Sequence, residues 1–178
     1  MDTILFARIA LFIHIVSLVT GFGSVLVIDT FGLLWLAKKV PLSLVMKVAN
    51  VTQRLIWLGW FGLVASGSYM LWFKGFIDNL TWVKLFFVAL VGLNGIWLHF
   101  IKKGFERIQN NPSLPPRLIF TMTLSTAISQ LGWWSAIAIG FLHHEWRGNI
   151  NWPPNPFVLM AVILCVVGVT LVIRNLAT

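Results

Sequence analysis

Charged residues, cysteine and tyrosine are scarce in this chain of 178 residues. Asp, Glu, Lys and Arg together make up 10% of the sequence, whereas a typical soluble domain holds about 25%. The single cysteine, Cys165, excludes an internal disulfide and a metal site built from several thiolates. No polar stretch is long enough to form a separate soluble domain. The composition therefore excludes a soluble enzyme and a disulfide-stabilised secreted domain.

Hydrophobic residues supply 58% of the chain, and the mean hydropathy is +0.89. They gather into stretches that are long enough to cross a bilayer as helices, which takes about 20 residues. The sequence thus predicts an all-α membrane protein, a bundle of five transmembrane helices that forms one domain over residues 1–178. The expected spans are 4–37, 48–73, 81–100, 118–142 and 157–173.

Basic residues outnumber acidic ones by 13 to 5, which gives a net charge of +8. Such an excess is also found in nucleic-acid-binding proteins, but here the basic residues lie mostly in connectors between apolar stretches. Membrane topology explains that distribution better, because cytoplasmic loops are enriched in Lys and Arg. We therefore expect the lipid bilayer, and no nucleic acid, as a partner. The same rule predicts the N-terminus outside and the C-terminus in the cytoplasm.

The first stretch, 4–37, carries ionisable residues in an otherwise apolar run. Each is a site hypothesis, because an ionisable group is unfavourable in hydrocarbon. At 100° per residue, its histidine falls on one helical line with small residues. This face is predicted to point into the protein and the opposite face toward lipid. The ionisable residues are Arg8, His14 and Asp29, and the small residues beside His14 are Ser17, Gly21, Ser24 and Gly32.

The fourth stretch, 118–142, holds a regular stripe of small side chains that ends in a histidine. One interpretation is tight helix packing, for which small residues are suited. The other is a flat wall for a planar cofactor, formed in part by Ser129 and Gly132. The stripe consists of Thr121, Ser125, Ser129, Gly132, Ala136, Gly140 and His143.

Asp29 is expected to have a partner, because an unpaired carboxylate in a low-dielectric environment would become neutral. Arg54 and His99 lie at compatible depths in the predicted topology. Two alternatives stay open, a structural ion pair between helices and a functional relay.

His14 is the strongest single candidate for a ligand-binding residue. Neutral imidazole is the usual protein ligand of b-type haem, and small neighbours leave room for the ring. Arg8 and Lys84 are expected partners for the propionates. His143 and His99 are the candidates for a further metal ligand. The alternative role of His14 is a hydrogen bond between helices.

The pattern H-x6-G-x-G-x5-D is present as His14, Gly21, Gly23 and Asp29. Arg54 opens the second span, and His99 closes the third. Trp82 and Lys84 stand near the start of the third span. This arrangement resembles the small bacterial membrane proteins that include HemJ-like protoporphyrinogen oxidases and CopD-like membrane domains. The resemblance implies haem b on His14, an important role for Lys84 and a place in the bacterial inner membrane.

Three functions follow as hypotheses. The first is a haem b protein of membrane electron transfer and a candidate oxidoreductase, with Lys84, Asp29 and Arg54 as reactive groups. The second is a non-catalytic accessory subunit of a membrane complex. The third is a small cation or proton conductor that would require an oligomer, with relay groups Asp29, Arg54, His99, Gln130 and His14. A homo-oligomer or a larger membrane redox complex is the expected assembly.

Overall fold

The computed structural model describes residues 2–108 and 116–149, together with residues 163, 164 and 168. The described chain is all-α, as the sequence predicted. Its helices are α1 (Asp2–Leu36), α2 (Leu42–Lys74), α3 (Asn79–Ile108) and α4 (Pro116–Asn149). The chain divides into two compact units, Met1–Phe76 and Ile77–Thr178. The first holds α1 and α2, and the second holds α3 and α4. The single bundle expected over 1–178 stays a prediction.

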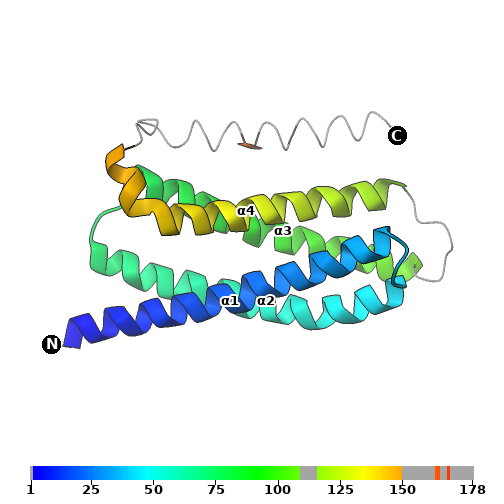
Figure 1. Ribbon diagram of the computed structural model, residues 1–178, viewed down its shortest axis with the longest axis horizontal. Coiled ribbons are helices and arrows are strands. Elements are labelled where there is room, and N and C mark those ends of the chain that lie inside the picture. Colours follow the sequence, from blue (N-terminus) through cyan, green and yellow to red (C-terminus); the bar gives the residue numbers. More distant parts are fainter. Residues whose placement is uncertain (1, 109–115, 150–162, 165–167, 169–178) are drawn as a thin grey trace. The chain divides into compact units, whose positions relative to one another are not determined.

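In the first unit, α1 and α2 form an antiparallel hairpin (Figure 1). A short turn joins them, and Pro41 stands at its end, at the N-cap of α2, in an extended conformation. Lys38 ends α1 with a positive φ of 58°. Its amide donates to the Trp35 carbonyl, and the next amide, that of Lys39, reaches back to Leu34. Since Pro41 lets a helix begin directly after it, α2 starts six residues before the predicted span.

The two helices of this hairpin approach closely because glycine and serine line their contact. A Cβ built on Gly59 would lie 2.5 Å from the Cα of Gly21 and 2.6 Å from the Ser17 carbonyl oxygen. A Cβ on Gly62 would overlap the Ser17 hydroxyl. Such distances leave no space for a side chain, so the backbones themselves are in contact. The predicted inward face of α1 is confirmed at Gly21 and Ser24, which are buried.

In the second unit, α3 packs against α4, also in antiparallel order (Figure 1). Leu80, Val83 and Phe87 of α3 are buried with Ile139 of α4. Gly132 of α4 lies under Val91, whose Cγ2 would be 2.6 Å from a Cβ at that position. The hairpin therefore combines an aliphatic core with one close approach at a glycine.

A buried amide also joins these two helices. Asn94 of α3, which is 7% exposed, donates from Nδ2 to the Ser125 carbonyl of α4 at 2.8 Å. Asn94→Ala is expected to lower the free energy of unfolding by about 1 kcal/mol, since one interhelical hydrogen bond is lost. Unfolding in mixed detergent micelles measures this. Asn50→Ala, at an exposed position of α2, is the matched control and should change stability little. Equal effects of the two substitutions would contradict the assignment.

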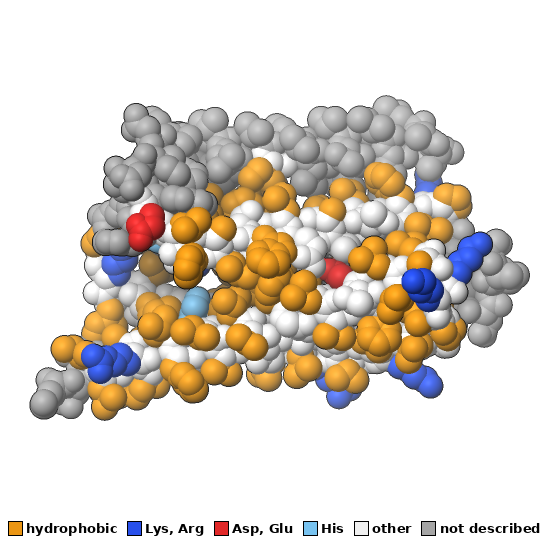
Figure 2. All heavy atoms as spheres, viewed as in Figure 1, with side chains coloured by type: hydrophobic (Ala, Val, Ile, Leu, Met, Phe, Trp, Pro, Cys, Tyr) orange, Lys and Arg blue, Asp and Glu red, His pale blue; other side chains and the backbone are white. Residues whose placement is uncertain are grey.

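Three of the described helices are long and apolar enough to cross a membrane: α1 over Ile4–Leu36, α2 over its full length and α3 over Asn79–Lys102. The prediction of five spans is wrong for the described residues, which contain four helices and three such candidates. Arg117, Gln130, His143 and Glu145, together with the small polar stripe, make α4 less apolar than the other three. Figure 2 shows hydrophobic side chains over the visible helix faces, with Lys and Arg side chains toward the helix ends. The described chain is thus a helical, multi-pass membrane protein.

The predicted fifth span, 157–173, falls largely outside the described residues. Ile163, Leu164 and Gly168 are described within it and are helical. Ile163 packs against the cluster that contains Leu80 and Phe87.

Candidate functional site

His14 lies on the predicted inward face of α1, and the helix that it faces is α2. Its Nδ1 is 2.9 Å from the hydroxyl oxygen of Ser66, which is 5% exposed. Gly67 stands next to Ser66, and a Cβ built on Gly67 would be 3.5 Å from Cε1 of the imidazole. The ring thus lies on a part of α2 that has only small side chains. The alternative role predicted for His14, a hydrogen bond between helices, is present.

The hydrogen bonds of Ser66 determine which imidazole nitrogen carries the proton. The Ser66 hydroxyl donates to the Gly62 carbonyl at 2.6 Å. Because its single proton is engaged there, the oxygen accepts from His14, so that Nδ1–H is the donor. In neutral His14 the remaining lone pair is then on Nε2. A histidine that ligates a metal usually has this arrangement, with the second ring nitrogen donating to a protein acceptor.

An apolar groove of about 400 Å³ opens at the same end of the hairpin. It is lined by Ile4, Ala7, Arg8 and Leu11 of α1 and by Phe73 of α2. Leu11 lies one helical turn before His14, and positions three residues apart share a face of a helix. Arg8 is exposed and is the only charged residue in this lining. The groove therefore offers an apolar surface with one guanidinium beside it.

Asp29 and Arg54 are not brought together. Asp29 is half-buried on α1 and has an electrostatic or hydrogen-bond interaction, whereas Arg54 is exposed. Within the described ranges, Arg54 forms no ion pair. His99 is exposed near the end of α3, with its ring 6.1 Å from that of Phe100. The roles predicted for these three residues stay predictions.

The small-residue stripe of α4 faces α3. Thr121, Ser125, Ser129 and Gly132 are buried, and the contacts at Ser125 and Gly132 come from Asn94 and Val91 of α3. These contacts are those of tight helix packing, the first of the two interpretations of the stripe. The space that Gly132 leaves is filled by the Val91 side chain.

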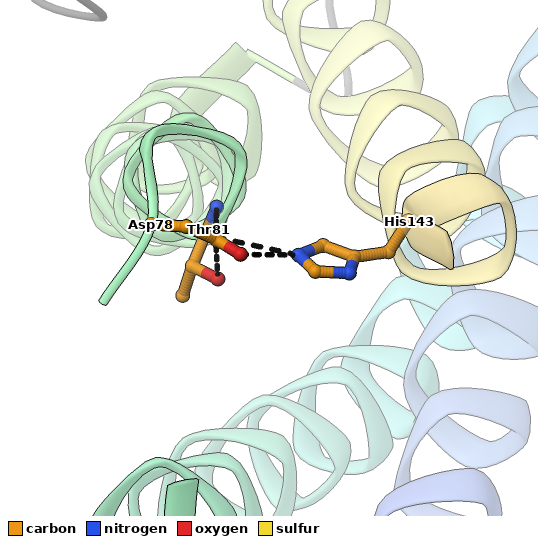
Figure 3. Close-up of polar contacts among 3 residues, drawn as sticks. All are labelled: Asp78, Thr81 and His143. Carbon is orange, nitrogen blue, oxygen red and sulfur yellow. Dashed lines mark hydrogen bonds and ion pairs between the residues drawn. The ribbon is translucent and has the colours of Figure 1, made fainter. Parts of the chain in front are cut away.

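A polar cluster lies where α3 begins and α4 ends (Figure 3). The carboxylate of Asp78 accepts from the Thr81 amide at 2.9 Å and from its hydroxyl at 2.5 Å. The Nε2 atom of His143 lies 3.0 Å from Oδ2 of Asp78 and 3.3 Å from Oδ1. One carboxylate thus caps α3 and holds an imidazole of α4. Lys84 lies nearby, because its Nζ is 3.1 Å from a Cβ built on Gly140, one turn before His143.

The sequence interpretation placed Lys84 and His143 among the site residues but missed Asp78 and Thr81. A local signal for the cap was present, since Asp three residues before Thr is typical of a helix N-terminus. No local signal marks the contact with His143, which is 65 positions away.

Comparison of the chain with protein-family models, with curated proteins and with solved structures finds no match in any of the three.

Proposed function

We propose that this multi-pass membrane protein binds haem b through Nε2 of His14 and serves in membrane electron transfer. The hydrogen bond from His14 Nδ1 to Ser66 is the observation that carries this proposal. It would orient the ring and leave the lone pair on Nε2, the state in which imidazole ligates iron. The small residues Ser66 and Gly67 let the ring lie close to α2.

The side chains of the first hairpin include an apolar surface and a guanidinium, which are chemically suited to the porphyrin ring and to the propionates of haem. The apolar groove, whose lining residue Leu11 lies one turn before His14, would contact a porphyrin face, and Arg8 would pair with a propionate. When bound, haem would supply a one-electron redox centre. The residues of the chain hold the imidazole, provide the apolar surface and neutralise the carboxylate.

The resemblance to HemJ-like and CopD-like proteins supports the same proposal and adds a cellular location. It favours the bacterial inner membrane and an important role for Lys84. Asp29 and Arg54 are the other residues proposed to take part in the reaction. Lys38 and Lys39 lie between α1 and α2, and Lys47 lies near the start of α2. These basic residues favour a cytoplasmic position for that turn and an external N-terminus. A homo-oligomer or a larger redox complex is the proposed assembly.

The test is an optical spectrum of the protein purified in mild detergent from cells supplied with a haem precursor. The wild-type protein should show a Soret band and a reduced-minus-oxidised α-band. His14→Ala should abolish both. Ser66→Ala should weaken haem affinity by about tenfold, the usual effect of losing the partner of a ligating histidine.

Ser24→Ala is the matched control for Ser66→Ala. Both serines are buried and donate to a carbonyl one turn earlier, but the Ser24 hydroxyl donates within α1, to Thr20. Its substitution should leave haem affinity unchanged. A wild-type protein without a Soret band, and without a spectral response to added haemin, would contradict the proposal. The accessory-subunit hypothesis would then be the better one.

A further inference from the structure

The second unit contains an imidazole held in a fixed orientation, separate from the proposed haem site. Asp78 holds His143 through Nε2, and Thr81 holds Asp78 through two hydrogen bonds. Since a carboxylate only accepts, neutral His143 carries its proton on Nε2 and has its lone pair on Nδ1. Within the part of the chain that the structure describes, Nδ1 of His143 has no hydrogen-bond partner. The side chain is 28% exposed, so the imidazole is not sealed inside the hairpin.

We propose that His143 is a general base that takes a proton from a weak O–H acid bound beside Lys84. In this step the acid's O–H bond breaks and an N–H bond forms on Nδ1. The electron pair stays on the oxygen as an anion. Two charges therefore develop, an imidazolium and an oxyanion.

The cluster has a stabilising group for each of these charges. The Asp78 carboxylate contacts the ring that becomes positive, as in established carboxylate–histidine pairs. The Lys84 amine lies at Gly140, one turn along α4 from His143, and in this proposal it stabilises the oxyanion. A Cβ at Gly140 would lie 3.1 Å from Nζ of Lys84, so a side chain there would displace the amine. Asp78 and Gly140 are thus positioning residues for the base and for the cation.

The experiment uses imidazole nitrogen NMR of the full chain in detergent micelles. The chain has four histidines, so His143→Asn identifies the His143 signals. At mildly alkaline pH, where free imidazole is neutral, the His143 signals should show Nε2 protonated and Nδ1 unprotonated. Asp78→Asn keeps an acceptor for the Thr81 amide but removes the negative charge. It should increase the population of the other tautomer.

Binding of an acid is probed with 4-propylphenol and, as a matched compound without the acidic proton, 4-propylanisole. The phenol should shift the His143 nitrogen signals, and the anisole should not. Lys84→Met should weaken phenol binding about tenfold, the effect of losing one charge-assisted hydrogen bond. Lys84→Arg, which keeps the charge, should retain most of the binding.

Three results would overturn the proposal. The first is a wild-type His143 protonated on Nδ1. The second is an equal response to the phenol and to the anisole, or none to either. The third is full phenol affinity in folded Lys84→Met, with the fold verified by circular dichroism. None of these readouts depends on haem, so a failure here is distinguishable from a failure of the haem proposal.

Discussion

Gly59→Ala is expected to lower the free energy of unfolding by about 2–3 kcal/mol. The added methyl would lie 2.5 Å from the backbone of Gly21 and 2.6 Å from the Ser17 carbonyl. Both neighbours are backbone atoms of α1, so no side-chain rotation relieves the overlap. The helices must separate, and the contacts along the hairpin weaken together. Unfolding of the purified protein by added SDS, followed by circular dichroism, measures the change.

Two other glycines provide controls for this effect. Around Gly23 on α1, a Cβ meets nothing within 4 Å, so Gly23→Ala should be neutral or stabilising by up to about 1 kcal/mol. At Gly132 the nearest atom is a methyl of Val91, a side-chain atom rather than backbone, so Gly132→Ala should be destabilising by about 1 kcal/mol. The order Gly59, Gly132, Gly23 is therefore the expected result. A Gly59→Ala protein as stable as Gly23→Ala would show that α1 and α2 are not in backbone contact.

Asp78→Ala is expected to be destabilising by about 2 kcal/mol, because one carboxylate has two structural roles. Loss of an N-cap side chain contributes about 1 kcal/mol. Loss of the hydrogen bond to His143 contributes a similar amount. Asp78→Asn keeps the cap acceptor, so it should have less than half of the effect. Unfolding under the same micelle conditions measures both variants.

A double-mutant cycle with His143→Ala separates the two roles of Asp78. If the carboxylate contacts His143, the effects of Asp78→Asn and His143→Ala should not add. Full additivity, or equal effects of Asp78→Asn and Asp78→Ala, would contradict the arrangement in Figure 3.

Helical periodicity predicted the face of α1 that contacts its neighbour. The spacing of His14, Ser17 and Gly21 gave the inward side, and all three contact α2. Composition predicted an all-α membrane protein, because the chain has too few charged residues for a typical soluble domain and its apolar stretches are long enough to cross a bilayer as helices. Those properties depend on residues near in sequence, and for this reason a single sequence contains them.

The pairing of helices was not predictable in the same way. Two stripes of small residues exist, one on α2 and one on α4, and each is a suitable neighbour for the His14 face. The structure pairs His14 with the α2 stripe at Ser66 and Gly67, while the α4 stripe packs on α3. The number of spans was wrong for the described residues. The stretch 118–142 is long and largely apolar, but its Ser, Thr and Gln residues reduce the hydropathy of α4, which is not among the three candidate spans.

Each helix of the described chain finds its tightest partner in the helix next to it in the sequence. Loop closure over so few residues is rapid, and local topologies fold faster than those with distant partners. The backbone contact between Gly21 and Gly59 can therefore form while the ribosome is still making the rest of the protein. Insertion of this chain into a bilayer should proceed by helix pairs, and each pair would arrive with its buried polar side chains, such as Ser66 and Asn94, already shielded from the acyl chains.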